Sequence, residues 1–312
     1  MSVTRREFVR EVGGGAVAAS VFAAISGATA FAGEHRLPIA FSTLGCPAWE
    51  WGQVLDFAQQ HGFSAIELRG LHGTMDLPSA PQFAAGQLAQ SKREVAAHGL
   101  RIACVSSSTN LHDSDPEKRR KQLDDARRFI DLASSLGAPY VRVFGNKIEG
   151  DRAATLERVV AGLRELGAYA GPKHVTVIIE SHGDFTDSPT LRQIMEGANS
   201  RHVGLLWDAH HTFAASHEEP EFTVRQLGRW IRHTHLKDSV PAEKDRKYVL
   251  TGRGGVPVER QVQALAAVHY RGFYTFEWEK AWHPDLEDPA VAFADYATVM
   301  RQYLQAAHAH AG

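Results

Sequence analysis

Eight short apolar runs alternate with helical stretches along this chain of 312 residues, and this alternation constrains the fold more than any other feature. Most runs are rich in Val, Ile or aromatic residues, as buried parallel strands are. The runs cover residues 38–44, 64–68, 100–105, 140–144, 175–180, 203–208, 231–236 and 273–278. Helical patterns follow them near residues 51–61, 82–98, 116–136, 152–170, 189–196, 221–228, 258–268 and 289–307.

Eight strand–helix units predict a single (β/α)8 TIM barrel over residues 33–312. A doubly wound open sheet is the alternative, but it usually has fewer strands and a Gly-rich first turn. The first turn here, residues 43–47, lacks that motif. The one Gly-rich piece, residues 252–255, directly follows no predicted strand, so we interpret it as a loop rather than a phosphate cradle.

Several boundaries of the predicted helices carry their own signals. Asp115 precedes Pro116, which places a capping residue before proline at the first helical position. Gly62, Gly99 and Gly137 each follow a helical run, where a left-handed cap is expected. These signals support the assignment of helices between the strands.

The first 32 residues resemble a twin-arginine export signal. Arg5, Arg6 and Phe8 precede a Gly- and Ala-rich apolar stretch that ends in small residues. The alternative is a membrane anchor, because residues 12–32 reach the length of about 20 residues that spans a bilayer. Large aliphatic residues are few in the stretch. We therefore expect a cleaved signal, a periplasmic protein and no stable membrane insertion after cleavage.

The charge balance argues against nucleic acid as a partner. Lys and Arg number 34 and Asp and Glu 36, so the formal net charge is −2. Without residues 1–32, which hold three Arg and two Glu, 31 basic and 34 acidic residues remain, a net charge of −3. A nucleic-acid binder needs a basic surface to neutralise phosphates. Cys46 and Cys104 are expected to be buried thiols, with a disulfide between them as the alternative.

Acidic and histidine side chains end the last four predicted strands. A barrel places its chemistry at the carboxyl ends of its strands, so these positions are the most informative ones. A carboxylate inside an apolar strand is costly unless it is paired or binds a cation. The residues are Glu180 and His182, then Asp208, His210 and His211, then His233 and His235, and finally Glu277 and Glu279.

Two glutamates, one aspartate and one histidine would form a hard, oxygen-rich metal site. Such a donor set favours Mn²⁺, Mg²⁺ or Co²⁺ over structural zinc, which prefers Cys and several His. We expect one divalent ion, Mn²⁺ first, with Zn²⁺ as a further candidate. The alternative is a buried ion-pair network in which Lys237, Lys280 and Arg142 neutralise the acids.

The motifs at these strand ends resemble a known family. They are E-S-H-G at residues 180–183, W-D-x-H-H at 207–211, H-x-H-L-K-D at 233–238 and E-W-E-K-x-W-H-P at 277–284. Together they resemble the sugar phosphate isomerase/epimerase family, which has a xylose isomerase-like barrel. The resemblance implies that the metal ligands are Glu180, Asp208, His235 and Glu277, and that His211 contacts the substrate.

In the related ketose 3-epimerases the two metal-bound glutamates also move the proton, so the resemblance implies Glu180 and Glu277 as catalytic residues. A metal that holds adjacent carbonyl and hydroxyl oxygens acidifies the C–H between them, and a carboxylate can then remove the proton. Those epimerases carry a further Glu six residues after the first ligand, where this chain has Thr186. The expected activity is a metal-dependent isomerase or epimerase acting on a sugar or keto sugar.

Three other functions remain as alternatives. A lyase or dehydratase on the same scaffold would catalyse β-elimination on a 3-keto-glycoside or an inosose-type substrate. A catalytically silent sugar-binding protein would not need all four ligands. An apurinic endonuclease of the related barrel would need extra metal-binding histidines and a basic face, which the net charge disfavours.

The remaining candidates are residues expected to contact a small carbohydrate substrate. For Arg142 and Glu67, the alternative to a substrate contact is an ion pair with each other inside the barrel. Trp207, inside a strand, is expected to pack in the core, whereas Trp282, beyond the last strand, is a candidate for stacking on a sugar ring. A homo-oligomer is compatible with the sequence. The substrate-binding candidates are His211, His182, Glu67, Arg142, Lys237 and Trp282, with His210, His233 and His283 behind them.

Overall fold

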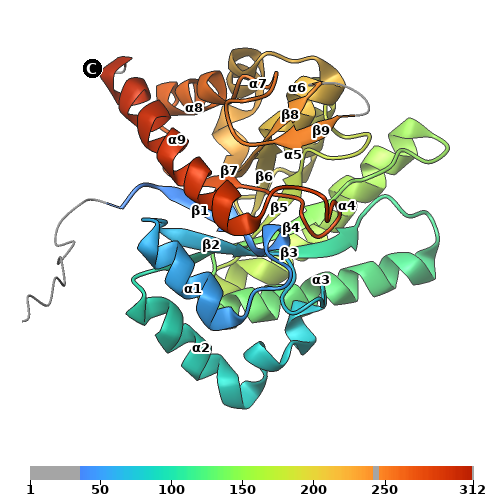
Figure 1. The fold of residues 1–312 in the computed structure, drawn as a ribbon. Coiled ribbons are helices and arrows are strands. Elements are labelled where there is room, and N and C mark those ends of the chain that lie inside the picture. The colour runs from blue at the N-terminus through green and yellow to red at the C-terminus, as the bar shows by residue number, and fades with distance from the viewer. Residues whose placement is uncertain (1–35, 242–245, 311–312) are drawn as a thin grey trace, which may run out of the picture. The chain divides into compact units, whose positions relative to one another are not determined.

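Eight parallel strands close into a barrel, as the sequence predicts (Figure 1). The computed structural model describes residues 36–241 and 246–310, except for the side chains of residues 308–310. The predicted export signal, residues 1–32, lies outside the described residues. The closed barrel excludes the doubly wound open sheet, which has two free edges.

The strands follow one another around the barrel in chain order. The last barrel strand, β10, pairs in parallel with β1 through Ile39 and Tyr274 and closes the sheet. The barrel strands are β1 (Ile39–Ser42), β2 (Ala65–Leu68), β3 (Arg101–Asn110), β4 (Tyr140–Phe144), β5 (Thr176–Glu180), β6 (Val203–Asp208), β7 (Ile231–Leu236) and β10 (Tyr274–Phe276). Each lies within or overlaps a predicted run, although β3 extends five residues beyond the prediction, to Asn110.

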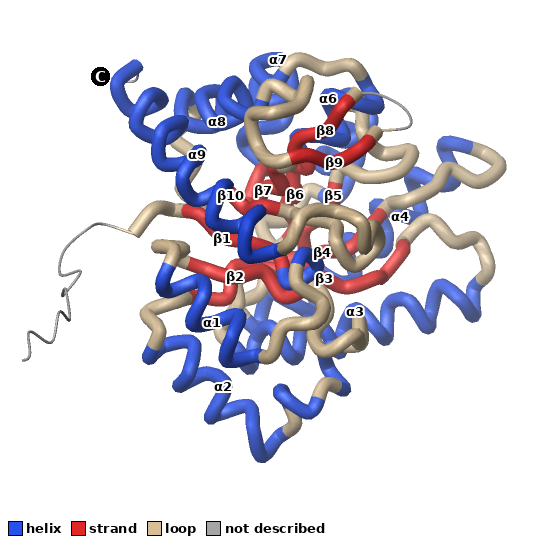
Figure 2. Tube along the Cα trace, viewed as in Figure 1, coloured by secondary structure: helices blue, strands red, loops and turns tan. Residues whose placement is uncertain are grey.

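Helices surround the barrel on the outside (Figure 2). They are α1 (Trp51–Gln60), α2 (Ala85–Ala97), α3 (Pro116–Leu136), α4 (Arg152–Ala170), α5 (Ser188–Ala198), α6 (Ala209–Ser216), α7 (Pro220–Leu227), α8 (Val258–Ala267) and α9 (Pro289–His310). One α-helix and two strands were not predicted. They are α6 and the strands of an antiparallel hairpin, β8 (Asp238–Val240) and β9 (Lys247–Val249). No described helix is long and apolar enough to cross a membrane.

The capping signals read from the sequence are confirmed. The Asp115 side chain accepts hydrogen bonds from the backbone N–H groups of Glu117 and Lys118, both at 2.9 Å. At the other end of α3, Gly137 has φ +79° and its N–H returns to the carbonyl of Ala133. These caps satisfy backbone groups that the helix itself leaves unpaired.

Residues 252–255 form a loop, which confirms the interpretation of the Gly-rich piece. Backbone N–H groups of this loop donate hydrogen bonds to a carboxylate of the protein itself. Asp238, at the start of β8, accepts hydrogen bonds from the backbone of Gly252, Gly254 and Val256 at 2.8–3.0 Å. The contact ties the Gly-rich loop to the hairpin that follows β7. These donors are therefore occupied and do not form a phosphate cradle.

The main hydrophobic core fills the space between the strands and the helices. Phe41 of β1 stacks on Phe293 of α9 with ring centroids 4.2 Å apart, and Phe276 of β10 stacks on Tyr296 at 4.6 Å. Trp207 is fully buried, which confirms its predicted packing role. Cys46 and Cys104 are buried free thiols, so the expectation of thiols is confirmed and the disulfide is not formed.

The inside of the barrel changes from apolar to charged along the strands. Small side chains such as Ala40 and Ala65 form a cluster near the amino ends, and Ile178 and Leu206 form another further along. Because alternate residues of a barrel strand face inward, the next inward positions after Ile178 and Leu206 are Glu180 and Asp208. The fold therefore gathers its buried charges at the carboxyl ends of the strands.

Candidate active site

Four side chains at the carboxyl ends of the strands form one buried cluster. Each offers a ligand atom, and these atoms all lie within 4.8 Å of one another. The cluster consists of the four predicted metal ligands, Glu180, Asp208, His235 and Glu277. They come from β5, β6, β7 and the residue after β10, so the tertiary structure brings together residues that are nearly 100 positions apart.

Glu67 orients the histidine of this cluster. Its Oε2 atom lies 2.8 Å from Nε2 of His235 and 2.7 Å from Nε2 of His233, and its Oε1 accepts a hydrogen bond from Ser42. Burial acts to raise the pKa of Glu67, but His235 and His233 outweigh it and hold the pKa below its usual range. The ionised Glu67 thus holds Nε2 of His235 and leaves Nδ1 facing the three carboxylates.

Asp208 is oriented by the helix that it begins. Its Oδ1 accepts the backbone N–H of His211 at 3.0 Å and so caps α6. Its backbone N–H donates to the Ser181 hydroxyl at 2.8 Å. The second carboxylate oxygen, Oδ2, remains directed toward the cluster, where it lies 4.0 Å from Nδ1 of His235.

Lys237 lies behind the acids and not in a substrate cavity. It is fully buried, and its Nζ is 2.7 Å from Asp208 Oδ2 and 2.8 Å from Glu279 Oε1. It also donates to Glu277. Burial acts to lower the pKa of Lys237, but the negative charges of Asp208 and Glu277 outweigh it and raise the pKa well above its usual value. The structure therefore gives Lys237 carboxylate partners in place of the expected substrate contact.

Arg142 pairs with Glu180 and not with Glu67. Its guanidinium lies 2.9 Å from Glu180 Oε2, and both side chains are only 2% exposed. The guanidinium also lies over the ring of Phe144, 3.9 Å from its centroid. The ion pair of Arg142 with Glu67 that the sequence suggested is therefore wrong, because Glu67 is already occupied by two histidines from β7.

Glu180 and Glu277 lie in different electrostatic surroundings. Burial and the nearby Glu277 raise the pKa of Glu180 above its usual value, although Arg142 partly opposes them. Burial also acts to raise the pKa of Glu277, but His235 and Lys237 outweigh it and hold the pKa well below its usual range. The surroundings thus shift the pKa values of these two carboxyl groups in opposite directions, upward for Glu180 and downward for Glu277.

A small cavity of about 120 Å³ opens above the cluster. Its size suits a single small ring or an open chain of a few carbons better than a polymer. Glu180 and Glu277 both line it, whereas Glu67 and Lys237 do not. Trp282, which is 52% exposed, stands at its edge. The lining residues are Leu44, Arg69, Arg142, Phe144, Glu180, His182, His211, Glu277, Glu279 and Trp282.

His211 and His182 place their rings side by side at this cavity, with centroids 5.2 Å apart. His211 Nδ1 is 3.0 Å from the Ser181 carbonyl, so Nδ1 carries the proton and Nε2 is left as an acceptor. Burial, followed by the charge of Lys237, holds the pKa of His211 well below its usual value. His211 is therefore a neutral imidazole.

The loop that carries His182 depends on a glycine. Gly183 has φ +62°, and a Cβ built on it would lie 2.0 Å from the carbonyl oxygen of Asn146. A side chain at this position would therefore force apart the loops that follow β4 and β5. His182 itself contacts the Phe144 ring, with centroids 4.7 Å apart.

The other candidate histidines lie outside the cavity. His233 is buried in the barrel on Glu67, and His210 is buried with Nε2 2.9 Å from the Ser239 hydroxyl. His283 is half exposed and lies 3.8 Å from Glu279. One lining residue, Arg69, was not among the predicted substrate-contacting residues, because its burial depends on how β2 packs in the barrel.

The four-residue cluster can hold a metal ion. His235 Nδ1 is buried and has no hydrogen-bond partner among the described residues. It nevertheless lies 3.2 Å from Glu277 Oε1 and 3.9 Å from Glu180 Oε1. An imidazole nitrogen facing three carboxylates, with its other nitrogen fixed by a fourth, is the arrangement seen around protein-bound metals.

The comparison with known families agrees with this geometry. Residues 55–303 match the xylose isomerase-like TIM barrel family. The chain belongs to that family. No curated protein matches the chain.

Solved structures with the same fold have low sequence identity to this chain. An L-ribulose 3-epimerase superposes with a TM-score of 0.74 at 17% identity, covering 88% of this chain and 96% of the other. The probable 3-DHS dehydratase AsbF from Bacillus anthracis gives 0.71 at 16%, covering 85% and 99%. The IolI protein, with a bound zinc atom, gives 0.68 at 18%, covering 86% and 98%. At these identities the likeness establishes the fold alone.

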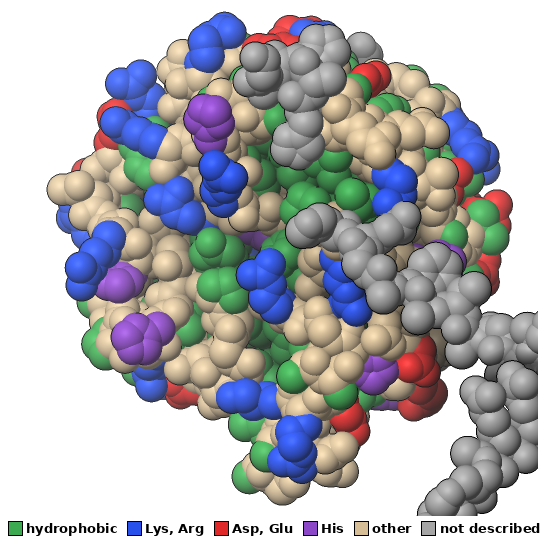
Figure 3. Space-filling view, turned by 90° about the vertical axis from the view of Figure 1, so that its left-hand side faces the viewer, with side chains coloured by type: hydrophobic (Ala, Val, Ile, Leu, Met, Phe, Trp, Pro, Cys, Tyr) green, Lys and Arg blue, Asp and Glu red, His purple; other side chains and the backbone are tan. Residues whose placement is uncertain are grey.

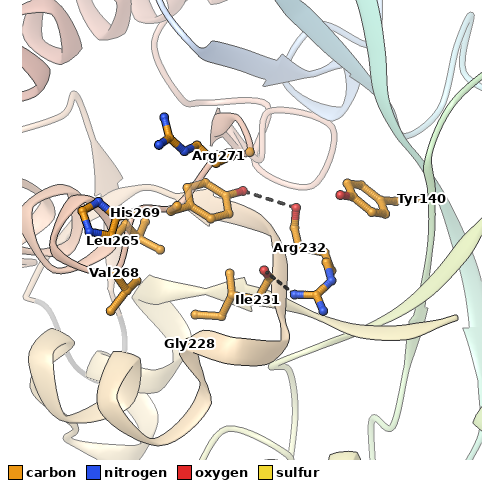
Figure 4. A pocket seen from close by; sticks show the side chains of 10 residues that line it. Tyr140, Gly228, Ile231, Arg232, Leu265, Val268, His269 and Arg271 are labelled. Carbon is orange, nitrogen blue, oxygen red and sulfur yellow. Dashed lines mark hydrogen bonds between the residues drawn. The ribbon is translucent and has the colours of Figure 1, made fainter. Parts of the chain in front are cut away.

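A second cavity of about 310 Å³ lies at the opposite end of the barrel (Figure 4). It is lined by residues at the amino ends of β4 and β7, including Tyr140 and Arg232, and by the loop before β10. The Tyr270 hydroxyl donates a hydrogen bond to the Arg232 carbonyl, and Figure 4 shows the Arg232 guanidinium beside the Ile231 carbonyl, to which it donates. No carboxylate lines this cavity. It therefore lacks the pair of carboxylates that the cavity at the carboxyl ends of the strands offers.

Proposed function

We propose that this protein is a divalent-metal-dependent isomerase or epimerase that moves a proton beside the carbonyl of a sugar or keto sugar. The observation that carries the proposal is the position of Glu180 and Glu277. Both belong to the four-residue cluster and both line the cavity. Their strands, β5 and β10, are separated in the barrel wall by β6 and β7, so the carboxylates reach the cavity from different sides.

The charges around the cluster support a divalent cation. When all five carboxylates are ionised and His235 is neutral, as metal binding requires, the five carboxylates and three cations of this region leave an excess of two negative charges. A divalent ion would balance this excess, and the oxygen-rich donors favour Mn²⁺, with Mg²⁺, Co²⁺ and Zn²⁺ as further candidates. The carboxylates are Glu67, Glu180, Asp208, Glu277 and Glu279, and the cations are Arg69, Arg142 and Lys237.

When bound, such an ion would polarise adjacent carbonyl and hydroxyl oxygens of the substrate and acidify the C–H between them. Residues of the protein would carry out the proton transfer and hold the substrate. One of the carboxylates Glu180 and Glu277 removes the proton, and the other returns a proton from its own side of the cavity. The neutral His211 offers its Nε2 atom to a substrate hydroxyl, and Trp282 provides a flat surface at the cavity edge.

The test is proton exchange in deuterated water. Protein reconstituted with Mn²⁺ is mixed with a panel of keto sugars and 3-keto-glycosides and followed by NMR. We expect deuterium to enter the substrate next to the carbonyl without loss of a group. Release of an alcohol or of water would instead identify the β-eliminating lyase, a reaction type that the dehydratase among the similar structures keeps open.

Two variants and a control make the test specific. Glu180→Gln and Glu277→Gln should each slow exchange by roughly 10²–10⁴-fold, the usual contribution of a positioned acid or base. Glu165→Gln, which changes an exposed carboxylate paired with Arg127, should leave exchange unchanged. If both cluster variants keep their metal and the full rate, the proposed roles are wrong.

A further inference from the structure

Three cations lie at the cavity or beneath it, and they differ in their partners. Lys237 contacts three carboxylates, and Arg142 pairs with Glu180. The side chain of Arg69 makes no hydrogen bond and no ion pair with any described residue, although it lines the cavity. Arg69 is thus the one guanidinium at this cavity whose charge has no contact partner among the described residues.

Arg69 is nonetheless held firmly in place. It directly follows β2, and its backbone N–H donates to the Thr43 hydroxyl at 2.8 Å, while that hydroxyl donates to the Gly70 carbonyl at 2.6 Å. The side chain is only 7% exposed, and its Nη1 atom is buried without a hydrogen-bond partner. Burial and the nearby charge of Arg142 lower the pKa of Arg69 to about 10, although the more distant charges of Glu180, Glu277 and Glu67 partly oppose them.

Two other residues that line this cavity carry buried polar atoms without a hydrogen-bond partner among the described residues. Arg142 uses Nη1 for Glu180, but its Nε and Nη2 atoms are buried and unbonded. His182 Nδ1 is likewise buried without a partner. A buried polar group without a partner costs about 1–3 kcal/mol, and a charged one costs more. The guanidinium groups of Arg69 and Arg142 therefore present unpaired N–H donors to one small cavity. A bound anion in that cavity would satisfy these donors.

We propose that Arg69, together with Arg142, forms a carboxylate-binding subsite, so that the substrate of this enzyme is a sugar acid rather than a neutral sugar. The planar guanidinium matches a carboxylate through paired hydrogen bonds. A singly charged carboxylate suits the site better than a dianionic phosphate, because Glu180, Glu277 and Glu279 line the same cavity and repel negative charge. This inference rests on the proposed function, whose substrate class it narrows.

The test uses matched ligands that have no ketone or aldehyde group and therefore cannot react by the proposed route. D-gluconate and D-sorbitol differ only in whether the first carbon is a carboxylate or a hydroxymethyl group, and D-sorbitol 6-phosphate adds a dianion. Binding to the full chain loaded with Mn²⁺ is measured by isothermal titration calorimetry. We expect D-gluconate to bind at least about tenfold more tightly than D-sorbitol. Equal binding of the two, or a preference for the phosphate, would overturn the subsite.

A variant separates Arg69 from direct binding of the carboxylate to the metal. Arg69→Gln should weaken D-gluconate binding by roughly tenfold to a hundredfold while leaving D-sorbitol binding and metal content unchanged. Arg271→Gln, an exposed arginine that lines the cavity at the other end of the barrel, is the matched control and should change neither ligand. Equal weakening of both ligands by Arg69→Gln would show a structural role only and would overturn the proposal.

The binding test and the exchange test fail independently. Arg69-dependent selection of D-gluconate in a protein that exchanges no substrate proton would support the subsite and contradict the proposed enzymatic function. Proton exchange on neutral keto sugars without selection of D-gluconate would support the function and overturn the subsite.

Discussion

The two ends of the barrel differ in whether their charged side chains are buried or exposed. At the carboxyl ends of the strands, four buried carboxylates, the partly exposed Glu279 and three buried cations lie in one contiguous region around His235. At the amino ends, charged side chains stay at the surface. Figure 3 shows hydrophobic side chains in the middle of that face, with Lys and Arg around them. Arg101, for example, is exposed and lies over the Phe273 ring, 4.6 Å from its centroid.

The difference follows from what fills the barrel at each end. Ala40, Ala65 and Ala103 pack the interior near the amino ends and leave no room or need for charge. At the carboxyl ends the inward positions hold acids, whose burial is tolerated only through contacts with Lys237, Arg142 and His235. One end of the barrel therefore supplies stability, and the other supplies reactive groups.

The largest expected effect comes from replacing one lysine at each end of the barrel, Lys237 at the carboxyl ends of the strands and Lys173 at the amino ends. Lys237→Met would leave Asp208, Glu277 and Glu279 without their cation, so we expect a loss of about 3–5 kcal/mol in unfolding free energy without metal. Lys173→Met removes a surface lysine paired with the exposed Asp131 near the start of β5, and its cost in unfolding free energy should be far smaller.

Urea unfolding with a chelator measures both lysine variants. Saturating Mn²⁺ should restore part of the stability of Lys237→Met, because a bound cation would replace some of the lost charge. Equal losses in the two variants would contradict the contrast between the barrel ends.

A smaller effect is expected at Glu67, which orients His235. Glu67→Gln removes the charge that holds Nε2 of His235, so Mn²⁺ affinity should fall by about 10–100-fold. Titration with Mn²⁺, read by calorimetry, measures the change. Glu94→Gln is the control, because Glu94 accepts a hydrogen bond from Trp51 outside the barrel and should leave metal affinity unchanged. Unchanged affinity in Glu67→Gln would show that Glu67 does not support the metal site.

The smallest effect concerns a histidine near the amino ends. His98 Nε2 lies 2.9 Å from Asp56, and the Glu94 carbonyl followed by Asp56 raises the pKa of His98 above its usual value. The raised pKa stabilises the folded state fully below the unfolded pKa of about 6.5, and this contribution is lost as pH rises through the folded pKa. His98→Gln should therefore cost up to about 0.5–1 kcal/mol at pH 5.5 and less at pH 9.

Urea unfolding of His98→Gln and of the unchanged protein at the two pH values checks this expectation. A loss that is the same at pH 5.5 and pH 9 would mean that the His98 contact does not depend on its charge.

Local patterns revealed most of the fold and the acids and histidines at the strand ends, and the family resemblance selected the four that the structure brings together as one cluster. The short helix α6 was missed because it directly follows a strand, and its capping residue, Asp208, had been considered only as a ligand. The β8–β9 hairpin was missed because its anchor, Asp238, is bound by backbone groups that lie 14 or more residues later. Contacts of that kind leave no periodic signal in the sequence.

The sequence by itself determined the alternation of strands and helices and the charged residue at each strand end, because burial and capping depend on residues close together in the chain. Only the tertiary structure decided which charges pair. Glu67 meets His233 across 166 positions, which leaves Arg142 for Glu180 and Lys237 for the acids of the cluster. Arg69 is left without a contact carboxylate for the same reason, since the barrel closure sets how far each strand end reaches.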